Sequence, residues 1–225
     1  MRIIEALKYG VYRTPLLQRL MAPSYPYKIS PGQLSAILEF INATRDTDGA
    51  VVEIGVAQGD TSVFILEHLK TTGDPRKAYF FDTFEGFTRE SVNHEVGARG
   101  KMEKDYDAFS YCDQSIFEKN LERLGYSNFQ TVKGDASKYD WSRIAPIAVV
   151  LLDIDLYQPT IDVLRRIWPH VVDGGEIVVD DCLPDSAWDG SLAAYQEFRE
   201  EIGHPFIRVG DKGGVLRKSE SNADP

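Results

Sequence analysis

Apolar and polar positions alternate between two periods along the chain. Leu34, Ile37, Leu38 and Ile41 recur at helical spacing, whereas residues 50–55 form a short apolar run that ends in a glycine turn. The same alternation continues toward the C-terminus. It predicts further helices near 60–70, 117–124, 161–171 and 192–202, and further strands near 78–81, 129–133, 147–152 and 176–179.

Strands that alternate with helices indicate a doubly wound, mostly parallel sheet with helices on both faces. The strands are almost continuously apolar, as expected for strands buried on both sides. Near the C-terminus, apolar runs at 206–209 and 214–217 flank a turn at 211–213, a pattern typical of an antiparallel hairpin. We therefore expect an α/β fold with a seven-stranded, Rossmann-like sheet and a C-terminal antiparallel hairpin.

The chain has 225 residues, which fits one domain with additions better than two domains. We expect a main domain over 31–217, preceded by a helical arm over 1–30 that carries many apolar residues. The polar segment 218–225 is expected to be a flexible tail. Residues 86–113 are long and charged for a connection, which indicates a lid or substrate loop, with a disordered insertion as the alternative.

Charge and composition exclude several classes of protein. There are 25 Lys and Arg against 35 Asp and Glu, a net charge of −10, which argues against a nucleic-acid partner. No apolar run approaches the roughly 18–20 residues that span a bilayer, so no membrane partner is expected. Two cysteines make no disulfide framework, and the N-terminal segment lacks the pattern of a signal peptide. We expect a cytoplasmic protein.

Carboxylates gather where the expected strands end. Glu53, Asp82, Asp135, Asp153 and the pair 180–181 each end or directly follow a strand. In open α/β sheets, ligands bind beyond the carboxyl ends of the strands. Like charges at one edge are unfavourable unless a cation compensates them. The pattern therefore predicts a binding site with a cation at this edge.

The first strand leads into a turn with glycines at 55 and 59. Their G-x-x-x-G spacing differs from the dinucleotide fingerprint, so no pyrophosphate cradle is indicated. Asp82, at the end of the second strand, is placed to accept hydrogen bonds from ribose hydroxyls. Together, the turn and Asp82 indicate a cofactor that contains a nucleoside.

A second group of carboxylates follows the fourth and fifth strands. Asp153, Asp155, Asp180 and Asp181 offer oxygen ligands that suit Mg²⁺, with Mn²⁺ or Ca²⁺ as alternatives. Asp155 is equally well explained as a helix cap, and Cys182 as a small buried side chain.

Four segments resemble the macrocin O-methyltransferase (TylF/MycF-like) family: VVEIGVAQG (51–59), FDTFEGF (81–87), LDIDLYQPT (152–160) and GGEIVVDD (174–181). The resemblance continues at 188–190, Ala194 and Phe198, and spans roughly residues 25–217. It implies a class I methyltransferase that uses S-adenosylmethionine and Mg²⁺ to methylate a hydroxyl, often on a sugar of a natural product. It also favours a homodimer.

The resemblance assigns roles residue by residue. Asp153, Asp180 and Asp181 match the metal ligands, and Asp153 also matches the catalytic base. The residues assigned to the cofactor are Glu53, Gly55, Gly59, Thr61, Asp82, Thr83, Phe84, Asp135, Ala136, Ser137 and Asp153.

The residues around Asp153, the first of the expected metal ligands, indicate which group accepts the proton. Related catechol-type methyltransferases carry a lysine there, whereas residues 153–157 contain none. A carboxylate must then take the proton, Asp153 in preference to Asp155, with His94 as a further candidate. Two alternatives stay open: a phenol or catechol acceptor, and a metal-dependent oxygenase, although no histidine pair lies near the aspartates in sequence.

Overall fold

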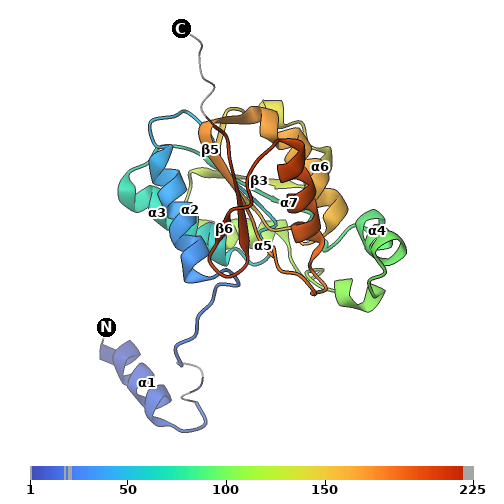
Figure 1. The fold of residues 1–225 in the computed structure, drawn as a ribbon. Helices are drawn as coiled ribbons and strands as arrows, with labels where there is room; N and C mark the ends of the chain where they lie inside the picture. Colours follow the sequence, from blue (N-terminus) through green and yellow to red (C-terminus); the bar gives the residue numbers. More distant parts are fainter. Residues whose placement is uncertain (1, 18, 20–21, 220–225) are drawn as a thin grey trace.

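The computed structural model describes residues 2–17, 19 and 22–219. The described residues form a seven-stranded sheet of order β3-β2-β1-β4-β5-β7-β6 (Figure 1). Strands β1 to β5 are mutually parallel, and β7 runs antiparallel to β5 and β6. The expected α/β fold with its C-terminal hairpin is confirmed. The strands are β1 (Ala50–Ile54), β2 (Ala78–Asp82), β3 (Phe129–Lys133), β4 (Ile147–Leu152), β5 (Val171–Val179), β6 (Arg208–Val209) and β7 (Gly213–Arg217).

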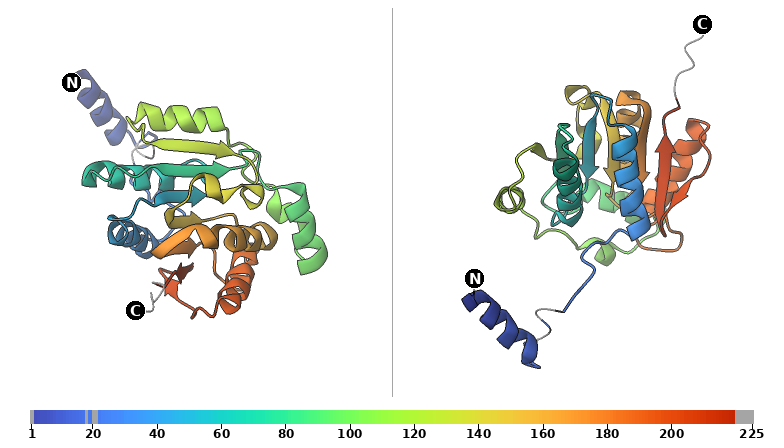
Figure 2. Two further views of the ribbon diagram at one scale, coloured as in Figure 1. Left: turned by 90° about the horizontal axis from the view of Figure 1, so that it is seen from above. Right: turned by 90° about the vertical axis from the view of Figure 1, so that its left-hand side faces the viewer.

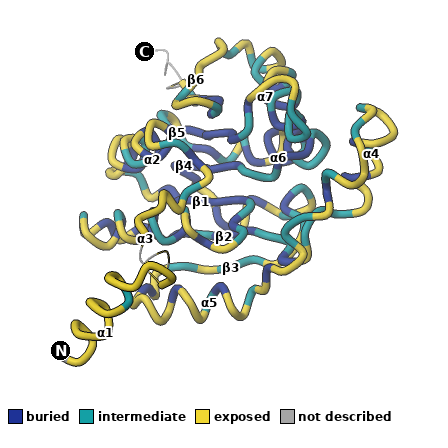
Figure 3. The backbone as a smooth tube through the Cα atoms, turned by 90° about the horizontal axis from the view of Figure 1, so that it is seen from below, coloured by how far each residue is buried: buried dark blue, intermediate teal, exposed yellow. Residues whose placement is uncertain are grey.

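Helices cover both faces of the sheet (Figure 2). Helices α2 (Pro31–Ala43), α3 (Asp60–Thr72) and α5 (Gln114–Arg123) bury their apolar side chains against one face. Helices α6 (Tyr157–Ile167) and α7 (Gly190–Glu201) bury theirs against the other. This two-sided cover explains why the strands are apolar throughout: every residue of β1 and β4 is buried, and the central strands are dark in Figure 3.

Strand β5 differs from the sequence expectation. It begins at Val171 rather than near residue 176, so Gly174 and Gly175 lie within the strand instead of stopping a helix. The pairing of β4 with β5 shifts register at this point. Gly174 has a φ of +74°, and a Cβ at Gly175 would lie 2.8 Å from the carbonyl oxygen of Ala148. The two glycines therefore allow an irregular stretch of β5 to pass close to β4.

The segment 86–113 is largely helical. It contains α4 (Arg89–Arg99) and a short 3₁₀ helix, η2 (Glu103–Tyr106). The side chain of Thr88 accepts a hydrogen bond from the N–H of Ser91 at the start of α4. In the structure, this segment therefore contains helices instead of a long irregular loop.

The N-terminal helix α1 (Arg2–Arg13) stands apart from the rest of the molecule (Figures 1 and 2). Its Ile3, Ile4 and Leu7 are all exposed, Ile3 to 78%. The expected arm is thus helical over 2–13. Of the expected tail, residues 220–225 lie outside the described residues. Among the helices that the structure describes, none is long and apolar enough to cross a membrane.

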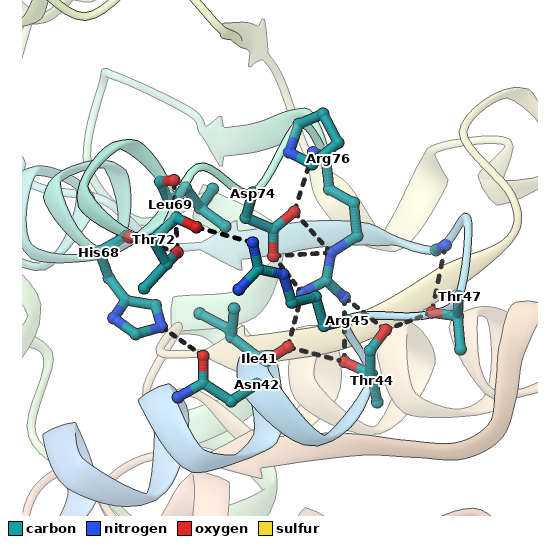
Figure 4. Close-up of polar contacts among 12 residues, drawn as sticks. Ile41, Asn42, Thr44, Arg45, Thr47, His68, Leu69, Thr72, Asp74 and Arg76 are labelled. Atoms are coloured by element: carbon teal, nitrogen blue, oxygen red, sulfur yellow. Dashed lines mark hydrogen bonds and ion pairs between the residues drawn. The ribbon is translucent and has the colours of Figure 1, made fainter.

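A buried ion pair joins elements at the edge of the sheet where the parallel strands begin (Figure 4). Both oxygens of Asp74 lie within hydrogen-bond distance of the Arg76 guanidinium, the shortest contact being 2.5 Å. Arg76 also donates to the carbonyl oxygens of Thr44 (2.9 Å) and Ile41 (2.5 Å). These bonds tie the end of α2 to the start of β2, and they lie at the sheet edge opposite the carboxyl ends of the strands.

Candidate active site

The carboxyl ends of the parallel strands meet at one edge of the sheet, and a pocket opens there. Its walls come from the ends of the five parallel strands β1 to β5, from the segment 86–113 and from the turn before β7. The residues used below that line it are Gly55, Asp82, Thr83, Phe87, Phe109, Asp135, Ala136, Asp153, Asp155, Asp180, Asp181 and Lys212.

The glycine turn after β1 is explained by close approach of the backbone. Gly55 has a φ of +87°, and a Cβ there would lie 1.7 Å from the carbonyl oxygen of Asp153. No other residue fits where the ends of β1 and β4 pass so closely. Gly59 begins α3 with a φ of +93°, and its Cβ would meet the ring of Phe117 at 2.7 Å. Gly55 lines the pocket, whereas Gly59 packs behind it.

Asp82 joins the turns after β1 and β2. Its Oδ2 accepts hydrogen bonds from the N–H groups of Val56 (2.9 Å) and Ala57 (3.2 Å), and its Oδ1 accepts one from Phe84 (2.7 Å). Each carboxylate oxygen has two lone pairs, so Oδ2 is saturated. Oδ1, which otherwise has only a long 3.5 Å contact from the hydroxyl of Thr83, retains capacity to accept one ligand hydroxyl in the pocket.

Asp135 is fixed in a similar way at the end of β3. Its Oδ1 accepts hydrogen bonds from the N–H and the hydroxyl of Ser137, and Lys138 lies 3.1 Å from its Oδ2. Burial acts to raise the pKa of Asp135, but the bonds from Ser137 and Lys138 outweigh it and lower the pKa below its ordinary value. Asp135 therefore presents a carboxylate to the pocket at neutral pH.

Only part of the predicted cofactor set lines the pocket. The lining members are Gly55, Asp82, Thr83, Asp135, Ala136 and Asp153. The others, which lie outside the lining, are Glu53, Gly59, Thr61, Phe84 and Ser137.

Glu53 is directed into the protein instead of the pocket. Its side chain is buried beneath α3 and accepts a 2.5 Å hydrogen bond from the hydroxyl of Ser62. Burial raises the pKa of Glu53 to about 8, against the lowering effect of that bond. The carboxyl group is thus largely protonated at neutral pH.

Three carboxylates form a compact group at the other end of the pocket. Asp153, Asp155 and Asp181 each offer an oxygen, and these oxygens all lie within 4.8 Å of one another. Asp155 and Asp181 have φ values of +62° and +53°, a backbone conformation that non-glycine residues seldom adopt. Such strain concentrates at functional sites. The donor set of carboxylate oxygens suits a hard divalent cation.

Asp180 has different surroundings from the other three. Its Oδ1 accepts a 2.6 Å hydrogen bond from Nε2 of Gln33, and its Oδ2 lies 2.8 Å from Nζ of Lys212. Lys212 Nζ also lies 2.5 Å from Oδ1 of Asp181. The compact group thus contains Asp155 where the sequence-based metal set has Asp180.

Sequence reasoning missed Gln33 and Lys212. The motif S-x-x-Q that Gln33 completes with Ser30 was a visible helix-capping signal, and the structure contains that capping box. Lys212 lies in the hairpin turn, 59 positions after Asp153 in the numbering, so no local motif connects it with the aspartates. Residues 153–157 contain no lysine, as noted from the sequence, but the fold brings Lys212 to the site.

Burial and mutual repulsion raise the pKa values of the buried carboxyls. For Asp153, burial is the main cause and repulsion from Asp180 the next. For Asp155, burial is again the main cause, followed by its hydrogen bond with Asp181. A buried carboxylate with a raised pKa is a stronger proton acceptor than an exposed one.

The histidines do not contribute to this site. None of the four, all within the described part of the chain, lines the pocket. His94 stacks on Tyr157, with ring centroids 5.4 Å apart and planes 15° apart. The structure therefore does not place His94 as a second base, and no two-histidine iron site is assembled in the pocket.

The segment 86–113 forms one wall and is fastened to the loop after β5. Arg99 donates to Oδ1 of Asp189 at 2.5 Å, and Lys101 lies 2.7 Å from Oδ2 of the same residue. The rings of Phe87 and Trp188 lie 5.6 Å apart. The wall is thus held by paired charges and by aromatic contacts.

The sheet order, the glycine turn after β1 and the ligand pocket at the carboxyl edge define the fold of class I methyltransferases. The solved structure of the O-methyltransferase NovP matches with a TM-score of 0.74 at 19% identity, covering 88% of this chain and 84% of that one. At this identity the likeness concerns the fold.

The particular family follows from sequence. Residues 32–218 match the family described as macrocin-O-methyltransferase (TylF), and the chain belongs to it. The resemblance noted from the motifs is confirmed, and with it membership of a family of O-methyltransferase enzymes.

Two relatives are each 27% identical to the chain. One is the 8-demethyl-8-(2,3-dimethoxy-alpha-L-rhamnosyl)-tetracenomycin-C 4'-O-methyltransferase of Streptomyces olivaceus, aligned over 78% of this chain and 68% of the relative. The other is the mycinamicin III 3''-O-methyltransferase of Micromonospora griseorubida, aligned over 79% of this chain and 72% of the relative.

Proposed function

We propose that this protein transfers a methyl group from S-adenosylmethionine to a hydroxyl of a small molecule, most naturally a sugar of a glycosylated natural product. The observation that carries the proposal is the two-ended pocket, with Asp82 and Asp135 at one end and the group of Asp153, Asp155 and Asp181 at the other. The names of both relatives support the acceptor class, since one refers to a rhamnosyl tetracenomycin and the other to mycinamicin III.

The residues present fit the cofactor. Asp82 would accept a hydrogen bond from a ribose hydroxyl, and Asp135 with Ala136 would lie against the adenine. Gly55 leaves room for the backbone to approach the methionine part, since any side chain there would clash with the end of β4. When bound, S-adenosylmethionine supplies the electrophilic methyl group.

The acidic group fits a divalent cation because it offers only oxygen donors close together. Asp153 and Asp181 would hold it, with Asp155 or Asp180 completing the set, and Mg²⁺ is the metal we propose, with Mn²⁺ or Ca²⁺ as alternatives. When bound, the metal lowers the pKa of a coordinated hydroxyl.

Asp153 is the proposed base. It directly follows β4, lines the pocket and has a raised pKa because of burial and repulsion from Asp180. It would take the proton of the acceptor hydroxyl as the methyl group moves to the oxygen. Asp155, in the same group and with its pKa also raised by burial, is the alternative base.

The acceptor would lie against the wall formed by the segment 86–113. Phe87 and Phe109 line the pocket there, and aromatic rings offer apolar faces on which sugars stack. We propose this segment as the lid of the acceptor site. The net charge of −10 fits a small-molecule acceptor better than a nucleic acid.

We further propose that two copies associate through α1. Its apolar side chains are exposed, although such a patch is normally covered by another surface. Light scattering on the full chain is expected to give twice the 25.3 kDa chain mass, and Leu7→Asp is expected to give a monomer. A wild-type mass of one chain would contradict the dimer.

Calorimetric titration of S-adenosylmethionine tests the central proposal, with and without Mg²⁺, on the wild type, Asp82→Ala and Asp181→Ala. We expect cofactor binding that Asp82→Ala weakens, and a separate Mg²⁺ heat that Asp181→Ala abolishes. Transfer of labelled methyl groups is then compared between glycosylated polyketides and catechol. No cofactor heat in the wild type would overturn the proposal, and transfer to catechol alone would move the acceptor to phenols.

A further inference from the structure

The ammonium of Lys212 lies between two of the four aspartates of the acidic site. Its Nζ is 2.8 Å from Oδ2 of Asp180 and 2.5 Å from Oδ1 of Asp181. The Lys212 side chain is 16% exposed and that of Asp180 is 1% exposed. The contact is therefore a largely buried ion pair, in which charge is screened much less than at the surface.

The fold fixes the position of this lysine. A Cβ at Gly213 would lie 2.9 Å from Nε2 of Gln33, and one at Gly210 would lie 2.3 Å from Oγ of Ser30. The hairpin turn thus packs directly on the start of α2. The N–H of Cys182 donates to the carbonyl oxygen of Lys212 at 2.7 Å, which fastens the turn to the end of β5 as well. Because the turn is held at both points, the side chain of Lys212 is delivered to the site by backbone packing.

One ammonium does not balance the charge of the site. Four aspartates (Asp153, Asp155, Asp180 and Asp181) line this end of the pocket, and Lys212 contacts two of them. A dication would be attracted to the same oxygens. It would also be repelled by an ammonium that already lies 2.5 Å from one of its proposed ligand atoms.

We propose that Lys212 is a built-in counter-cation that competes with the divalent metal for Asp180 and Asp181, and so sets the metal affinity of the site. This inference rests on the metal site of the proposed function. It assigns Lys212 a positioning role: the lysine holds the two carboxylates together and withdraws from Asp181 when the metal binds. A merely structural ion pair predicts the opposite, because loss of the lysine would then loosen the carboxylates and leave metal affinity unchanged or weaker.

Mn²⁺ binding, measured by electron paramagnetic resonance, tests the inference. The proteins compared are the wild type, Lys212→Met, Lys212→Arg and the control Lys133→Met. Lys133 pairs with Glu85 at the same sheet edge, where both side chains are well exposed. We expect Lys212→Met to tighten Mn²⁺ binding about tenfold or more, since an adjacent repelling charge is removed. Lys212→Arg and Lys133→Met should stay within about threefold of the wild type. Thermal unfolding of each variant checks that it is folded.

A second readout uses the unmodified protein and so does not depend on any variant folding. Saturating Mn²⁺ should raise the rate at which acetic anhydride labels Lys212, measured by mass spectrometry, and leave the rate at Lys133 unchanged. Equal or weaker Mn²⁺ binding by a folded Lys212→Met protein, or an unchanged labelling rate at Lys212, overturns the inference alone. Absence of Mn²⁺ binding in every protein overturns the proposed metal site and the inference together.

Discussion

Nε2 of Gln33 donates a 2.6 Å hydrogen bond to Oδ1 of Asp180, although 147 positions separate the two residues in the chain. The other end of the same amide completes the capping box of α2, because Oε1 of Gln33 accepts from the hydroxyl and the N–H of Ser30. One fully buried side chain thus connects the first helix of the sheet domain to the acidic site.

Replacing Gln33 should therefore affect stability. Gln33→Ala leaves an oxygen of the buried Asp180 without its donor and removes half of the capping box. We expect a loss of about 1–3 kcal/mol in the free energy of unfolding, measured by urea denaturation. Gln130→Ala, at an exposed position, is the control and should stay within about 0.5 kcal/mol of the wild type. Equal losses in both variants would contradict a specific role for the bond.

The strands and their ends were predictable because burial on both faces leaves a simple sequence signal. The runs predicted at 78–81, 129–133 and 147–152 appear in the structure almost residue for residue. Strand β5 was predicted too short because Gly174 and Gly175 look like a helix stop, and only their packing against β4 explains them as strand residues. Helix α4 was missed because it carries many polar residues and shows little apolar periodicity.

For the candidate site, the residues at strand ends were predictable, but the directions of their side chains were not. Carboxylates at or just after strand ends, such as Asp82, Asp135 and Asp153, reach the pocket because strand direction alone places them there. Side-chain direction cannot be read in this way, and Glu53 is an example: it belongs to the predicted turn but is directed toward Ser62 in the interior. Lys212 could not be found either, since its place depends on how a distant hairpin packs.

Arg76 offers a test at the opposite edge of the sheet. Arg76→Met leaves the carboxylate of Asp74 buried without its partner and frees the carbonyl oxygens that end α2 (Figure 4). We expect a loss of about 3–5 kcal/mol in the free energy of unfolding. Arg45→Met, which removes a single bond to the carbonyl oxygen of Thr72 at an exposed position, should cost less than about 1 kcal/mol. Cofactor affinity should be unchanged in both, and a large loss of affinity in Arg76→Met would contradict a purely structural role.

Glu53 predicts a defined pH dependence of stability. Its pKa is raised from 4.5 to about 8 in the folded protein, so the folded state keeps a proton that the unfolded state loses as the pH rises between these values. This contribution to stability is complete below about pH 4.5 and is lost as the pH approaches 8. Glu53→Gln cannot titrate, so its stability relative to the wild type should rise by about 1.4 kcal/mol per pH unit within that window.

Urea denaturation from pH 5 to pH 9 measures the effect of Glu53→Gln. Glu122→Gln is the matched control, since it makes the same change at an exposed position. Its stability should follow that of the wild type at each pH. Parallel curves for Glu53→Gln and the wild type would show that Glu53 does not hold a proton in the folded protein.

The contacts of Asp189 predict a separation between acceptor and cofactor binding. Asp189→Asn weakens the ion pairs that Arg99 and Lys101 make with the loop after β5, so the wall formed by the segment 86–113 should become looser. The acceptor would lie against this wall, whereas the proposed cofactor contacts, Asp82 and Asp135, lie elsewhere in the pocket. We expect the acceptor KM to rise about tenfold and the Kd of S-adenosylmethionine to stay within about twofold.

Glu103→Gln, which removes an exposed pair with Arg89 on the same segment, should change neither value. Faster proteolysis within 86–113 in Asp189→Asn alone would tie the KM change to the wall, whereas an equal weakening of cofactor and acceptor binding would show that the ion pairs support the whole pocket.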